Sequence, residues 1–257
     1  MTGHLRIAGV SKRYGETAAL EDVSLDISPG ELHVLVGPSG CGKTTLLNAV
    51  AGFHDVEGDI ELDGRPVGGP GADRVVVFQH SALFPWRTVL ENVVYGPVVQ
   101  RRMSREAAAT LARDRLAQAG LADVADLHPG DLSTGVQRRV EIVRALVNEP
   151  RVLLLDEPFR GMDALTRSVM HESLLEFYDA AGVTVLFITH DIEEAVFLGS
   201  RVSVMTSRPG RIKETIDVDL PRPRDFHALS APEFVAVVAR VGAAVADEAR
   251  KAFAELA

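Results

Sequence analysis

The stretch that decides the fold reads Gly37-Pro38-Ser39-Gly40-Cys41-Gly42-Lys43-Thr44-Thr45. It matches the pattern G-x-x-x-x-G-K-[ST], in which a glycine-rich backbone wraps phosphate oxygens. An apolar run, Leu32–Val36, precedes it and a helical run, Thr45–Ala51, follows it. The motif requires this strand–loop–helix setting. We therefore predict a phosphate-binding loop at the positive N-terminal end of a helix.

Within this loop, three side chains have an expected role. Lys43 should reach the β- and γ-phosphates of a nucleotide, and the Thr44 hydroxyl should ligate Mg²⁺. Cys41 is expected to act as a small packing residue, and its alkylation should block nucleotide binding. Kinases, GTPases, helicases and transporter motors all share such a loop, so the loop alone does not choose among them.

Two later apolar strands end in polar residues. Val152–Leu155 runs into Asp156 and Glu157, and Val183–Thr189 is followed by His190. The carboxyl ends of parallel strands meet at one edge of a sheet, where ligands bind. We expect Asp156 to hold Mg²⁺ through its water shell and Glu157 to orient or deprotonate an attacking water. His190 would hydrogen-bond the γ-phosphate.

The chain divides into stretches of different character. Short strand-like runs, such as Leu5–Val10 and Val23–Ile27, fill the first third. Alanine, arginine and glutamate dominate from about residue 89 to 148, which predicts a helical insert in which Ser104 caps a helix. Strands and helices then alternate, which indicates a parallel sheet with helices on its faces.

The last segment, residues 230–257, is a separate predicted element that follows a main domain of residues 1–229. Its apolar residues recur at helical spacing and predict an amphipathic helix. They are Phe234, Val238, Val241, Val245, Ala249 and Phe253. Packing on its own domain is one reading of this helix, and a contact with another subunit is the other.

Composition narrows the possible classes of protein. The chain has 257 residues with 46% hydrophobic and 25% charged side chains, which excludes a disordered protein. A net charge of −9 argues against a general nucleic-acid binder, which needs a basic surface. The single cysteine, Cys41, forms no intrachain disulfide and fits a reducing compartment. Neither a bilayer-spanning run nor a signal peptide is recognisable, so we expect a cytosolic protein. Binding to a membrane protein stays open, because docking on one needs no hydrophobic span.

Together these motifs resemble the ATP-binding subunit of an ABC transporter, from about Leu5 to Arg224. Tyr14 resembles the family's aromatic residue that stacks on adenine, and Gln79 the glutamine that senses Mg²⁺ and contacts the membrane subunit. Leu132–Gln137 stands where the family's Leu-Ser-Gly-Gly-Gln/Met signature belongs, and Asp163 matches a loop that communicates between protomers.

The resemblance implies a fold, a reaction and partners. The fold is an α/β P-loop NTPase with a mostly parallel core sheet, an antiparallel β subdomain and an inserted α-helical subdomain. The reaction is hydrolysis of ATP with Mg²⁺ in a head-to-tail dimer, with Glu157 as the catalytic base and His190 as the switch histidine. Each ATP would lie between the phosphate loop of one copy and Ser133 and Gly135 of the other.

Three positions depart from the family pattern. In the signature segment, Thr134 replaces a glycine and Val136 replaces glutamine or methionine. Threonine adds a branched Cβ where the backbone would approach phosphate closely, and it is restricted at positive φ, where glycine is not. Impaired hydrolysis is therefore an open alternative. Arg160 stands where a small residue is commoner. The chain is therefore read either as an active motor or as a nucleotide-binding regulatory subunit. Its partner ATPase subunit would be a second copy or a related chain, and in the latter pair this chain would be the weaker ATPase.

Several segments are similar to importers of nitrate, aliphatic sulfonates and taurine, among them Leu83–Val93 and Arg208–Ile212. This resemblance implies membrane-spanning permease subunits as partners through the Gln79–Trp86 region. It also implies an external solute-binding protein as an indirect partner, and a position on the cytoplasmic face of the membrane. Phe84 and Trp86 would form an exposed docking loop or a buried anchor. A soluble, non-transport ABC ATPase is the remaining alternative.

Overall fold

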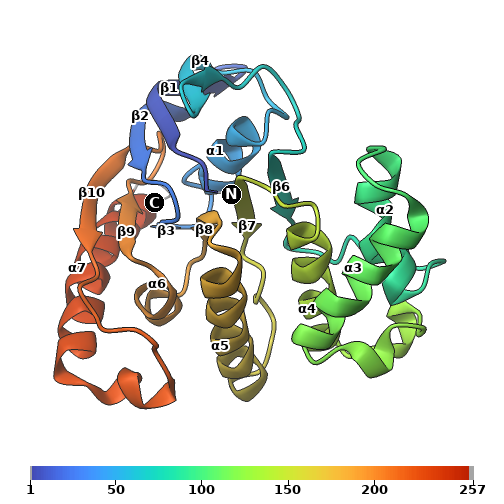
Figure 1. Ribbon diagram of the computed structural model, residues 1–257. Coiled ribbons are helices and arrows are strands. Elements are labelled where there is room, and N and C mark those ends of the chain that lie inside the picture. Colours follow the sequence, from blue (N-terminus) through green and yellow to red (C-terminus); the bar gives the residue numbers. More distant parts are fainter. Residues whose placement is uncertain (1, 255–257) are drawn as a thin grey trace.

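A sheet of six strands, in the order β10-β9-β3-β8-β7-β6, forms the centre of the computed structural model, which describes residues 2–254 (Figure 1). The five strands from β9 to β6 are parallel, and β10 is antiparallel at one edge. Every residue of β3, β7 and β8 is buried, as continuous apolar strands covered on both faces require. The strands are β3 (Leu32–Val36), β6 (Arg74–Val77), β7 (Val152–Asp156), β8 (Thr184–Ile188), β9 (Arg201–Met205) and β10 (Ile212–Asp217).

An antiparallel sheet, in the order β2-β1-β4-β5, lies above helix α1 (Lys43–Val50) in Figure 1. Leu46 and Leu47 of α1 are fully buried in a core that residues of both sheets share. The helix that follows the phosphate loop is therefore held from two sides. The strands are β1 (Leu5–Tyr14), β2 (Thr17–Ile27), β4 (Glu57–Leu62) and β5 (Arg65–Pro66).

The inserted helices lie to one side of the central sheet (Figure 1) and have a hydrophobic core of their own. Ser104 caps α3 by accepting from the Ala107 backbone N–H, as predicted. Helix α4 packs in two directions, because Val140 belongs to the helical core and Ile142 to the core of the central sheet. The elements are α2 (Val89–Val99), α3 (Arg105–Gln118), η1 (Ala122–Val124), η2 (Pro129–Asp131) and α4 (Thr134–Leu146).

Helix α1 covers one face of the central sheet, and three helices cover the other face. They are α5 (Ala164–Ala181), α6 (Ile192–Leu198) and α7 (Pro232–Ala254), with η3 (Phe226–Ser230) leading into α7. None of the helices within residues 2–254 is both long and apolar enough to cross a membrane.

Helix α7 packs on its own chain, against α6 and β9. Phe234 and Val241 are buried there, as the apolar spacing predicted. The prediction was wrong at Ala249, which is exposed, while the neighbouring Glu248 is buried among cationic partners. The side chain of Phe253 lies outside the described residues.

Candidate nucleotide site at the end of the central sheet

The phosphate loop connects the end of β3 to the start of α1. Gly42 caps the helix with φ 101° and offers no side-chain cap to the helical N–H groups. A Cβ at Gly42 would lie 2.7 Å from Leu20 Cδ2 and 2.8 Å from the Ala19 carbonyl oxygen, so only glycine fits. The loop thus presents free backbone N–H groups at a helix N-terminus, where an anion is favoured.

Lys43 lies inside this loop. Its Nζ donates to the carbonyl oxygens of Gly37, at 2.7 Å, and Pro38, at 3.0 Å. Cys41 is buried, and burial raises the pKa of its thiol against the opposing effect of the Lys43 charge. Cys41 therefore remains a neutral packing residue at physiological pH, which agrees with the role expected of a small side chain.

Asp156 and Thr44 lie together behind the loop. The Thr44 hydroxyl donates to Asp156 Oδ1 at 3.3 Å. Burial raises the pKa of Asp156 above its ordinary value, although the hydrogen bond from Thr44 acts in the opposite direction. A hydroxyl and a carboxylate oxygen are hard donors, so this pair fits a magnesium ion that keeps other ligands from phosphate and water.

Glu157 follows β7 with φ 43°, in the left-handed region that a glutamate seldom adopts. Its Oε2 lies 3.0 Å from Arg160 Nη1 and 3.3 Å from His190 Nδ1. The backbone N–H of Glu157 donates to the Ile188 carbonyl at 2.9 Å, which fixes the end of β7 to β8. The structure thus brings two of the predicted catalytic side chains, Glu157 and His190, into contact.

A cavity of about 520 Å³ opens over the phosphate loop. It is lined by the predicted residues Tyr14, Ser39, Gly40, Gly42, Lys43, Thr44, Thr45, Gln79 and Glu157. Thr17, Ala19, Arg160 and Arg208 also line it, and none of them was predicted to be a nucleotide-binding residue. Tyr14 lines the cavity and is 48% exposed, and Lys12 Nζ lies 5.5 Å from its ring centroid.

Ser133, Gly135 and Asp163 lie outside this cavity. Ser133 is exposed and caps α4, where its Oγ accepts from the Val136 N–H at 3.4 Å. Asp163 is also exposed and caps α5 by accepting from the Thr166 N–H at 3.0 Å. A single chain therefore does not bring the signature segment to its own phosphate loop.

The expected strain at Thr134 is absent. Thr134 is the first residue of α4, and its φ is not positive, so the branched side chain meets no backbone restriction. The restriction that glycine would relieve does not apply at this position. At Gly135, an added Cβ would lie 3.1 Å from Thr166 Cγ2, so space is tight one residue later.

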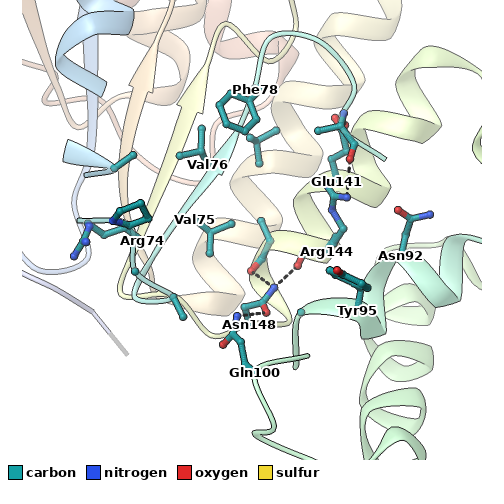
Figure 2. A pocket seen from close by; sticks show the side chains of 18 of the residues that line it. Arg74, Val75, Val76, Phe78, Asn92, Tyr95, Gln100, Glu141, Arg144 and Asn148 are labelled. Atoms are coloured by element: carbon teal, nitrogen blue, oxygen red, sulfur yellow. Dashed lines mark hydrogen bonds between the residues drawn. The ribbon is translucent and has the colours of Figure 1, made fainter. Parts of the chain in front are cut away.

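A second cavity, of about 600 Å³, separates β6 from the inserted helices. In Figure 2, Tyr95 and Asn92 of α2 face Val75 and Val76 of β6 across it. The loop before α2 contributes Phe84, whose ring centroid lies 4.8 Å from that of Tyr95.

The two aromatic residues of that loop, Phe84 and Trp86, differ in their exposure to solvent. Asn92 accepts from the Phe84 N–H at 2.8 Å and donates to the Phe84 carbonyl at 3.1 Å, so the loop is fixed. Phe84 is partly buried and acts as an anchor, whereas Trp86 is 71% exposed. The prediction of a buried anchor therefore fits Phe84, and the prediction of an exposed docking residue fits Trp86.

The fold and the cavity define a P-loop nucleotide-binding protein. The model of the family "ABC transporter" matches residues 20–160. The chain is 46% identical to the taurine import ATP-binding protein TauB of Chromobacterium violaceum, over 89% of this chain and 90% of that protein. It is 44% identical to the bicarbonate transport ATP-binding protein CmpD of Synechocystis, over 87% and 82%.

Among solved structures, the dimeric MJ0796, a bacterial ABC transporter cassette, is similar with a TM-score of 0.73 and 32% identity. That match covers 84% of this chain and all of the cassette, at 100%. The chain belongs to the ABC transporter family. It is an ATPase with the P-loop fold that the sequence predicted.

Proposed function

We propose that this chain is the motor subunit of an importer for a small solute of the nitrate, sulfonate, taurine or bicarbonate kind. One observation carries the proposal: a single cavity joins the phosphate loop to Glu157, and Glu157 contacts His190. The names of the taurine and bicarbonate relatives support import as the process that the ATPase drives.

The proposed hydrolysis site is shared by two copies in head-to-tail order. Ser133 and Gly135 belong to an α4 N-terminus that lies outside the cavity of their own chain. Facing the γ-phosphate of a second copy, the Ser133 hydroxyl and the helix N-terminus would supply a donor and a favourable dipole. Asp163, on the start of α5, would meet the partner copy in the same closed state. The dimeric form of the similar cassette supports this arrangement.

In the proposed mechanism, Tyr14 stacks on the adenine and Lys43 places positive charge beside the phosphates. Glu157 accepts a proton from the attacking water, and His190, which contacts Glu157, donates to the γ-phosphate. Closing the dimer brings Ser133 to the opposite side of the same phosphate. Positioning and charge stabilisation then account for most of the acceleration, as in other phosphoryl transfers.

Thr44, Asp156 and Gln79 are the residues that would hold Mg²⁺. Thr44 and Gln79 line the cavity, and Asp156 accepts from Thr44 behind it. The ion, when bound, neutralises charge on the β- and γ-phosphates. Residues of this chain do the rest by binding the nucleotide and orienting water.

The cavity beside β6 is the proposed docking site of the permease. The carbonyl oxygen of Gln79 accepts from Arg138 Nη2 of α4 at 2.6 Å, and Arg138 pairs with Glu141 at 2.6 Å. Gln79 is thereby tied to the helix that begins at the signature segment. The exposed Trp86 lies on the loop that borders the groove, where it would contact a membrane-subunit helix on the cytoplasmic face.

The alternative of a regulatory subunit rests on the departures in the signature segment. The ordinary helical backbone at Thr134 removes backbone strain as a reason for this alternative and so favours the active motor. The alternative of a non-transport ATPase is disfavoured by the transport proteins among the relatives.

Turnover of MgATP by the purified chain tests the proposal. The rate should rise more than linearly with protein concentration, because the site needs two copies. Glu157→Gln should lower turnover by about 10²- to 10⁴-fold while leaving nucleotide binding intact. Glu149→Gln is the matched control, since Glu149 is exposed and also has positive φ, at 51°. If Glu157→Gln hydrolysed ATP at the parent rate, the assignment of the base would be wrong.

A further inference from the structure

The loop between β9 and β10, residues 206–211, packs directly on the phosphate loop. A Cβ at Gly210 would lie 2.0 Å from the Cys41 carbonyl oxygen, so the two backbones are in contact. The Gly210 N–H donates to the Ala19 carbonyl at 3.0 Å. Thr206 closes the loop, because its Oγ1 accepts from the Arg211 N–H at 2.9 Å and donates to the Pro209 carbonyl at 2.8 Å. The loop is therefore a fixed part of the wall beside the nucleotide cavity.

Arg208 extends from this loop over the phosphate loop. Its Nε donates to the Gly40 carbonyl at 2.9 Å, and its Nη2 lies 3.1 Å from the position of a Cβ at Gly40. The side chain lines the nucleotide cavity. Among the described side chains, Arg208 has no carboxylate partner, and its two Nη groups make no hydrogen bond to protein.

The other cations of the cavity are occupied. Arg160 pairs with the carboxylate of Glu157, and Lys43 donates to two carbonyl oxygens of the loop. Arg208 alone offers a planar pair of Nη donors, the geometry that binds phosphate oxygens in a bidentate manner. Its positive charge stands beside backbone N–H groups that already favour an anion.

Helix α7 supports this loop from behind. Glu248 is 1% exposed, and its Oε2 accepts from the Ser207 N–H at 3.2 Å. Its Oε1 lies 3.1 Å from Lys213 Nζ and 2.7 Å from Lys251 Nζ. The residue next to Arg208 is thus fixed by a buried, neutralised carboxylate of the C-terminal helix.

We propose that Arg208 is a further nucleotide-binding residue that donates to the phosphates held by the loop, and that Glu248 is its positioning residue. The proposal rests on the nucleotide site proposed above. It gives the C-terminal helix a role in binding, because α7 fixes the loop from which Arg208 extends.

Binding of MgADP and of the magnesium complex of a non-hydrolysable imido analogue of ATP tests the role of Arg208. Arg208→Gln should weaken both by about tenfold, because both carry the phosphates that the loop holds. The affinity of Arg208→Lys for both nucleotides should lie between that of Arg208→Gln and that of the parent. Arg211→Gln is the matched control, since Arg211 is on the same loop but pairs with Glu21 at 2.8 Å and does not line the cavity. It should bind like the parent.

Two results would overturn the contact. One is parent-like binding by Arg208→Gln. The other is a fall in the urea midpoint of the nucleotide-free variant in step with its affinity, because this would mean that Arg208 only supports the loop. A parent chain that bound neither nucleotide would contradict the proposed site itself, and Lys43→Ala marks the level of affinity that remains without that site.

A double-mutant cycle tests Glu248. Glu248→Gln alone should weaken binding of both nucleotides by about threefold, and it should add no further loss in the Arg208→Gln background. Arg250→Gln is the control, because Arg250 is exposed on α7 and pairs with Asp247. An equal loss from Glu248→Gln in both backgrounds would show that Glu248 does not act through Arg208.

Discussion

The phosphate loop and the signature segment are both loops that lead into a helix, yet only one is complete within a single chain. At α1, Gly42 leaves the helical N–H groups without a side-chain cap, and a cavity lies over them. At α4, Ser133 caps its own helix and is exposed. A helix start without a side-chain cap leaves its N–H groups to water or to a ligand, whereas a capped helix start already satisfies one of them internally. Under the proposed function, this difference separates nucleotide binding, which one copy would perform, from hydrolysis, which would need two copies.

Among changes to these two loops, removing the glycine at the start of α1 should have the largest effect. We expect Gly42→Ala to weaken nucleotide binding by about 100-fold or more, because a residue at φ 101° is strained and its Cβ meets Leu20 and Ala19. Titration with a fluorescent ATP analogue measures this. Gly64→Ala is the control, since Gly64 has φ 72° with no atom within 4 Å of an added Cβ. Equal losses from both variants would contradict the close contact as the cause.

Removing the cap of α4 should affect turnover and spare binding. We expect Ser133→Ala to lower MgATP turnover by about 10- to 100-fold, the loss that follows from removing one transition-state donor. Nucleotide affinity of the dilute chain should stay unchanged, because Ser133 lies outside its own cavity. The lost cap should lower the free energy of unfolding by about 1 kcal/mol. A matching loss of affinity would contradict the division between the two loops.

Restoring the family glycine should change little. Thr134→Gly should alter turnover by less than about threefold, because Thr134 has no positive φ for glycine to relieve. Gly135→Ala should lower it more, because its Cβ would lie 3.1 Å from Thr166 Cγ2. A large gain in turnover from Thr134→Gly would revive the regulatory reading of the chain.

The smallest expected effect concerns stability without nucleotide. Burial raises the pKa of Asp156, so the folded state holds this proton more tightly than the unfolded state. The stability that protonated Asp156 contributes is fully present below the pKa of the unfolded state, near 3.8. It is lost as pH rises through the higher pKa of the folded state. Asp156→Asn lacks this loss and should be more stable than the parent at pH 7, with the advantage shrinking on acidification. Urea unfolding between pH 4 and pH 7 measures the trend, and a constant difference would contradict it.

The sequence predicted those parts of the site that form locally. The phosphate loop and the polar ends of β7 and β8 follow from short motifs beside apolar runs. The first strands were predicted too short, because β1 reaches Tyr14 through register shifts that let polar residues stay in the sheet.

Long-range contacts were beyond such reasoning. Arg208 meets Gly40 across 168 positions of the chain, and no local pattern indicates that contact. Glu248 is buried where the apolar spacing favoured Ala249, because Lys213, Lys251 and the Ser207 N–H neutralise it. Ion pairs and carbonyl contacts between distant segments leave no periodicity in the sequence.

Helix α4 connects the signature segment at Ser133 to the cavity beside β6. Its 13 residues span about 20 Å. Ser133 caps its start, Arg138 holds Gln79, and Arg144 lines the cavity beside β6. A permease helix bound in the cavity beside β6 and a phosphate bound at Ser133 would therefore contact the same rigid helix. By thermodynamic reciprocity, if binding of the permease raises the affinity of this chain for ATP, then ATP raises its affinity for the permease by the same factor.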